Sequence, residues 1–223
     1  MTNLNLLEAA ARQYAKDFGR NPVVTATLAP YDKDQDNRRI SRWFDPLLYW
    51  SLQKCRCWPR VLILLHNWGN EASSCGTVMC NVAYTKNCWL NLKRDNPSFR
   101  NMFDSATWSR RLIASGMCLV ANAAWGLWKS RKTTGMFENK QVYLSAARQL
   151  WLPLAIRIQP TRLYLCGRWA NPKEKRNKFV TEDGALSDSF GIAERALPNT
   201  EVILHCHPYW TPSWKAQRRL KRY

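Results

Sequence analysis

The sequence predicts an α/β fold, in which a central four-stranded parallel sheet lies between helices in a three-layer α/β/α arrangement. Four short apolar runs are each long enough for one buried strand, and stretches with helical patterning separate them. Strands that alternate with helices indicate βαβ units, and continuous apolar runs indicate a sheet covered on both faces. The runs occupy residues 60–65, 117–121, 163–166 and 201–206.

Helical segments account for much of the remaining chain. Residues 4–18 predict an amphipathic helix that begins with an Asn5/Glu8 capping box and stops at Gly19. Asp45-Pro46 opens a second helix that runs to Lys54, because proline suits a first helical turn. Further helices are expected over residues 103–115, 141–158 and 191–197.

One domain is expected over residues 1–223, because a chain of this length can bury a single sizeable core. Within it, residues 1–58 form an N-terminal helical and loop region. Residues 213–223 form a basic C-terminal tail.

Polar and aromatic residues follow each apolar run at once. All three histidines of the chain lie at or just beyond the ends of such runs. In a parallel sheet the functional loops lie beyond the carboxyl ends of the strands, so these residues predict one site at one sheet edge. They are His66-Asn67-Trp68, Asn122, Gly167-Arg168-Trp169 and His207-Pro208-Tyr209-Trp210.

The charge balance predicts an acidic polymer as the partner. The chain has 34 Lys and Arg against 16 Asp and Glu, a net charge of +18, and 12 tryptophans whose rings could stack on exposed bases. We therefore expect DNA, double-stranded or single-stranded, as the partner. A basic surface that serves only solubility is the simpler interpretation.

Several function classes are not favoured. No apolar run is long enough for a membrane span, and no secretory signal precedes the first helix, so we expect a cytoplasmic monomer. The eight cysteines are then expected to be reduced thiols. They contain no C-x2-C pair, so no structural metal and no cofactor are predicted.

The residues at the strand ends suit the hydrolysis of an N-glycosidic bond. In this hypothesis the catalytic residues are Asn67, which holds the water, and His207, which donates to the departing base. Asn122 reads the flipped base with its amide, and Tyr209 or Trp210 fills the gap left in the DNA. Backbone contacts are expected from Lys129, Arg131, Lys132, Arg168, Lys215, Arg218 and Arg219.

Each of these residues also has a structural interpretation. Asn67 and Asn122 can cap turns, His207 can satisfy a loop carbonyl, and the tail can be a solvated helix. A base-flipping DNA-binding protein without catalysis is a second functional hypothesis. A zinc hydrolase is a third, with His205-x-His207 joined by His66, Cys206 or Glu71.

Four stretches, in order over residues 61–212, resemble motifs of the uracil-DNA glycosylase superfamily. Leu65-His66-Asn67-Trp68-Gly69 is similar to the G-[IM]-N-P-G motif of its mismatch-specific and single-strand-selective branches. His207-Pro208-Tyr209-Trp210, with Pro212 close by, is similar to the final H-P-S-P motif. Leu119-Val120-Ala121-Asn122 resembles the strand that ends in the base-reading asparagine, and residues 163–170 resemble the L-L-W-G-x-x-A strand. The resemblance implies a uracil-DNA glycosylase-like fold and a monofunctional glycosylase.

Departures from the family pattern affect the expected substrate. The motif proline is Trp68 here, and the serine of the last motif is Tyr209. Gly69 stands where the strict uracil enzymes carry a tyrosine that blocks substituents at C5 of the pyrimidine. The resemblance therefore implies a larger base, such as the hydroxymethylated or glucosylated cytosine of phage DNA, and a role in phage defence. A uracil or mismatch repair enzyme is the alternative. The expected base contacts are His66, Trp68, Gly69, Glu71 and Asn122.

Overall fold

The computed structural model describes the N-terminal helix, the central sheet and the helices between its strands. The described residues are 2–20, 28–29, 45–65, 112–123, 127–128, 140–167, 169–171, 176–177 and 191–206. The statements below concern these residues.

A four-stranded, all-parallel sheet forms the centre of the described structure, as the four apolar runs predict. The strand order across the sheet is β3-β2-β5-β8. The α/β class of the fold is thereby confirmed. The strands are β2 (Val61–Leu65), β3 (Cys118–Asn122), β5 (Arg162–Gly167) and β8 (Glu201–Cys206).

The neighbouring strands β2 and β3 are buried on both faces of the sheet. All five residues of β2 and all five of β3 are buried, although successive side chains of a strand point to opposite faces. This pattern is compatible with the expected three-layer arrangement. Short additional strands form two antiparallel pairs apart from this sheet. They are β1 (Leu28–Ala29) with β4 (Leu127–Trp128), and β6 (Trp169–Asn171) with β7 (Arg176–Asn177).

The first helix, α1 (Asn3–Arg20), confirms the amphipathic helix but corrects its start and end. Thr2 caps it, because its Oγ1 accepts a hydrogen bond from the Asn5 backbone N–H at 3.3 Å. Asn5 is therefore inside the helix, and Gly19 does not stop it. The apolar face carries Leu7, Ala11, Ala15 and Phe18, which are all in the core.

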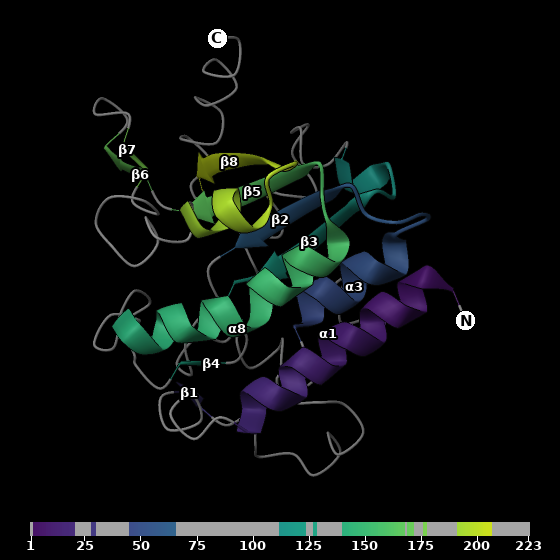
Figure 1. Cartoon of the computed structure of the whole chain (residues 1–223), viewed down its shortest axis with the longest axis horizontal. Coiled ribbons are helices and arrows are strands. Elements are labelled where there is room, and N and C mark those ends of the chain that lie inside the picture. The colour runs from purple at the N-terminus through teal and green to yellow at the C-terminus, as the bar shows by residue number, and fades with distance from the viewer. Residues whose placement is uncertain are drawn as a thin grey trace, which may run out of the picture.

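Two further helices pack close to α1. The second, α3 (Pro46–Lys54), begins where Asp45-Pro46 predicts, and α8 (Lys140–Ile158) contains Pro153 inside its span. Figure 1 shows α1, α3 and α8 together, with α1 in contact with both of the others and α3 against β3. The buried residues Leu150, Trp151 and Leu154 place the middle of α8 in the core.

Two shorter helical segments also match expectation where they are described. Residues 112–114 are helical and lead to Gly116, whose φ of +72° favours glycine after a helix. Residues 191–196 are helical, and they bury Ala193 before Leu197 enters the core.

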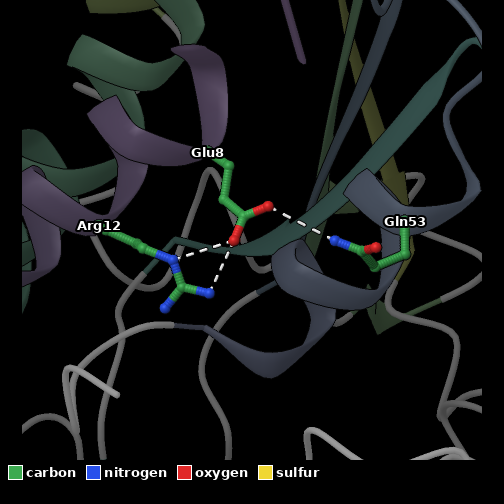
Figure 2. A network of polar contacts seen from close by, with 3 residues as sticks. All are labelled: Glu8, Arg12 and Gln53. Carbon is green, nitrogen blue, oxygen red and sulfur yellow. Dashed lines mark hydrogen bonds and ion pairs between the residues drawn. The ribbon is translucent and has the colours of Figure 1, made fainter. Parts of the chain in front are cut away.

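A polar network on the surface joins α1 to α3 (Figure 2). Glu8 Oε1 accepts from Nε and Nη2 of Arg12 at 3.0 and 2.7 Å, and Glu8 Oε2 accepts from Gln53 Nε2 at 3.4 Å. The Arg12 guanidinium also lies 5.5 Å from the centre of the Tyr49 ring on α3. Polar pairs that are exposed or only partly buried contribute little individually, so the apolar contacts carry most of the packing energy.

The outer edge of β3 is bonded to side chains of α3 instead of another strand. Ser51 Oγ is buried and lies 3.1 Å from both the N–H and the C=O of Val120. Asp45 accepts the backbone N–H of Asn122, and Cys55 Sγ donates to the Cys118 carbonyl at 3.5 Å. Alternate residues of a strand direct their backbone polar groups to the same side. Helix α3 thus runs antiparallel to β3 and covers its open edge.

The substitution Ser51→Ala should lower the free energy of unfolding by about 1–3 kcal/mol, because it leaves the buried backbone groups of Val120 without the hydroxyl to which they bond. Gln53→Ala is the matched control on the same helix. Its exposed contact to Glu8 predicts a change within about 0.5 kcal/mol. Urea unfolding followed by circular dichroism measures both. Equal effects of the two substitutions would contradict this account of the β3 edge.

Candidate functional site

The carboxyl ends of the four parallel strands lie at one edge of the sheet. Leu65 pairs in register with Asn122, and Gly167 pairs with Cys206. The strand order also locates a topological switch point. The chain passes from β2 outward to β3, but from β5 outward in the opposite direction to β8. Ligands of open α/β sheets bind beyond the carboxyl ends at such a point, which here lies between β2 and β5.

Of the residues predicted at the strand ends, Gly167 ends β5 and Trp169 begins β6, while His205 and Cys206, candidates for the zinc alternative, are the last two residues of β8. Asn122 is the one described residue with a predicted role in the glycosylase site. It is the last residue of β3, one position later than the apolar run predicts, and its side chain is 2% exposed. The next residue continues the ladder, since the Ala123 N–H donates to the Leu65 carbonyl at 2.7 Å. Asn122 is therefore held beside the end of β2, the strand that leads in sequence to His66 and Asn67.

A buried carboxylate that the sequence analysis missed as a site residue holds Asn122. Asp45 is fully buried, and its Oδ1 accepts from the side-chain Nδ2 of Asn122 at 3.1 Å. Its Oδ2 accepts from the backbone N–H of the same residue at 2.5 Å. Oδ1 also accepts from the Leu47 N–H at 3.0 Å, which is the capping bond of α3. One carboxylate thus caps a helix and fixes an asparagine at two points.

In the sequence, Asp45 is notable only because it precedes Pro46 at the start of a helix, and helix capping explains an aspartate there fully. Nothing in the local pattern indicates a partner 77 positions away in the sequence. Only the packing of α3 along β3 brings the two residues together.

The other predicted site residues lie outside the residues that the structure describes. These are His66, Asn67, Trp68, Gly69, Glu71, Lys129, Arg131, Lys132, Arg168, His207, Tyr209, Trp210, Lys215, Arg218 and Arg219. Their roles stay predictions. The strands β2, β5 and β8 precede several of these residues in the sequence. They end at Leu65, Gly167 and Cys206, at the same edge of the sheet as Asn122.

Within the described segments, no group of three or more His, Cys, Asp and Glu is arranged to hold a metal ion. Burial is the main cause that raises the pKa of the Cys55 thiol from 9.0 to about 12, and nearby Cys57 adds to it. Burial likewise raises the pKa of Cys118. Both thiols are therefore protonated at neutral pH, which suits the S–H donor of Cys55 and does not suit a nucleophile.

Comparison of the chain with protein-family models, with curated proteins and with solved structures found no match. In the described part of the chain, no helix combines the length and the apolar character needed to cross a bilayer.

The raised pKa of Cys55 predicts a loss of stability at alkaline pH. The unfolded chain loses this thiol proton above about pH 9, whereas the folded chain keeps it until about pH 12, so unfolding becomes more favourable across that interval. Cys55→Ser keeps a donor to the Cys118 carbonyl and does not ionise in this range.

Urea unfolding at pH 8 and pH 10.5, with reductant present, should show a smaller loss of stability for Cys55→Ser than for the wild type. Cys57→Ser, at an exposed position, is the control and should lose nearly as much as the wild type, because burial is the main cause of the raised Cys55 pKa and Cys57 the smaller one. An identical pH dependence for all three proteins would refute the assignment to Cys55.

Proposed function

We propose that the chain is a monofunctional DNA glycosylase with a three-layer, uracil-DNA glycosylase-like fold. It flips a pyrimidine out of DNA, hydrolyses the glycosidic bond with water and leaves an abasic site. The observation that carries the proposal is the position of Asn122, buried and held by Asp45 at the carboxyl edge of a parallel sheet. This is the residue expected to read the flipped base.

The arrangement of the strands supports a common site for the proposed residues. In the sequence, His66 and Asn67 follow the end of β2, and His207 follows the end of β8. These strands and β3 end at the edge that carries Asn122. The net charge of +18 supports a polyanionic substrate, because lysine and arginine neutralise phosphates.

The proposed chemistry divides between two residues. Asn67 orients the attacking water, since an amide cannot act as a base at neutral pH. His207 donates to the pyrimidine oxygen that gathers negative charge as the bond breaks. The rate then depends on orientation and on stabilising the departing base. No residue is assigned as a Schiff-base nucleophile, so strand cleavage is not part of the proposal.

The proposed substrate is a C5-modified pyrimidine, such as hydroxymethylated or glucosylated cytosine. Gly69, in place of a bulky residue, leaves room at C5, while His66 and Glu71 offer polar groups to a hydroxyl or sugar. Phage DNA carries such bases, so phage defence is the proposed setting.

The direct test uses oligonucleotides that differ in a single base: cytosine, uracil, 5-hydroxymethylcytosine or glucosylated 5-hydroxymethylcytosine. Single-stranded and double-stranded forms are incubated with the protein, and abasic sites are revealed by alkali. We expect abasic sites at the modified cytosines and intact strands before alkali. Excision confined to uracil would favour a repair enzyme, and no excision from any substrate would overturn the proposal.

Asn67→Ala and His207→Ala should each lower the single-turnover excision rate by about 100-fold or more, as for loss of a group that orients water or stabilises developing charge. Both should keep salt-sensitive DNA binding, because phosphate contacts supply most of the affinity.

Gln53→Ala, on the exposed side of α3, is the control for both assays and should behave like the wild type. Wild-type excision rates in both active-site variants would show that the site is wrongly assigned. An equal loss of binding and excision would indicate that the two residues bind DNA without a catalytic role.

A further inference from the structure

Helix capping explains one hydrogen bond to the Asp45 carboxylate and leaves two others to be explained. The cap requires an acceptor for the Leu47 N–H, and serine, threonine or asparagine would serve there as well. The other two bonds both go to Asn122, one to its backbone and one to its side-chain amide. A fully buried carboxylate is costly to maintain, so its use at this position calls for a role that a simpler cap cannot fill.

The carboxylate fixes which way the Asn122 amide lies. An ionised carboxylate offers only acceptors, so it must face the Nδ2 donor of the amide. Turning the amide over would place its carbonyl oxygen against Asp45 Oδ1, which now lies 3.1 Å from Nδ2, and would set two acceptors against each other. The backbone bond from Asn122 to Oδ2 holds the carboxylate itself in place. The donor and acceptor positions of Asn122 are thereby set before any ligand arrives.

Pyrimidines differ in the pattern that such an amide would read. A uracil-type base presents a donor at N3 and an acceptor at position 4, whereas a cytosine-type base presents an acceptor at N3 and a donor at position 4. An amide can pair with either pattern, but only by exchanging the places of its oxygen and nitrogen. A fixed amide therefore reads one pattern and opposes the other.

We propose that Asp45 is a positioning residue that determines specificity, because it fixes the Asn122 amide in the one orientation that reads a single pyrimidine pattern. The inference rests on the proposed glycosylase function. Asp45 acts through Asn122 and needs no contact with the base.

The probe is a pair of oligonucleotides that carry 5-hydroxymethylcytosine or 5-hydroxymethyluracil at the same position. Both bases have the same C5 substituent, and they differ only at the edge that Asn122 would read. The measured quantity is the ratio of their single-turnover excision rates. A general loss of stability or of DNA binding lowers both rates and leaves the ratio unchanged.

Two substitutions at position 45 keep a helix cap and remove the acceptor-only carboxylate. Asp45→Asn keeps the shape of the side chain, but its amide can meet Asn122 as either donor or acceptor. Asp45→Ser keeps an oxygen for the cap, but its shorter hydroxyl can both donate and accept, so it no longer requires Nδ2 of Asn122 to face it. Ser51→Ala is the matched control. Ser51 is equally buried and also joins α3 to β3, where it bonds to Val120, two residues before Asn122.

The wild type should prefer one base, and both variants at position 45 should shift the ratio toward the other by roughly tenfold, the effect of losing one hydrogen bond to a charged group. Ser51→Ala should lose stability and keep the wild-type ratio. An active wild type whose ratio is unchanged in both Asp45 variants would overturn the inference alone. A wild type that excises no base would overturn the proposed function, and this inference with it.

A measurement on the unmutated protein covers the case in which the Asp45 variants do not fold. In ¹³C,¹⁵N-labelled wild type, a fixed Asn122 amide should show a coupling across the hydrogen bond from its Nδ2 to the carboxyl carbon of Asp45, and the bonded proton should exchange slowly with solvent. A rapidly exchanging proton without this coupling would overturn the inference.

Discussion

The described structure depends on the way α3 covers the open edge of β3. An edge strand presents backbone donors and acceptors that need partners when they are buried. Asp45, Ser51 and Cys55 supply them at alternate residues along β3. These contacts fix the position of α3 against the sheet, and α1 then packs against both α3 and α8. The same contacts place the Asp45 carboxylate beside Asn122. The bonds of Asp45 to Asn122 therefore both attach α3 to the edge of β3 and form part of the candidate site.

This arrangement gives the candidate site a rigid base. Asn122 lies in a strand whose five residues are all buried, and its neighbour Leu65 ends another such strand. A side chain held by strand geometry and by a buried carboxylate loses little entropy when it meets a ligand, which favours selectivity among similar bases. The proposed catalytic residues follow the strands in sequence, whereas the proposed reader Asn122 belongs to the sheet itself.

Much of the fold was predictable because local pattern and tertiary structure agree. Continuous apolar runs predicted β2, β3, β5 and β8, and the Asp45-Pro46 pair predicted the start of α3. Errors occurred where two local signals compete. Thr2 caps α1 in place of Asn5, and α1 ends at Arg20, one residue beyond Gly19. Asn122 joined the strand because the ladder continues through Ala123 to Leu65.

The sequence by itself determined the α/β class, the four parallel strands, the basic character of the chain and the candidacy of Asn122. These features follow from composition and from short-range periodicity, because buried strands and buried helix faces require apolar residues at regular positions. Only the tertiary structure decided the strand order and the partnership of Asp45 with Asn122. Register and helix placement depend on contacts between residues far apart in the chain, and no local pattern encodes which distant N–H a capping carboxylate will also accept.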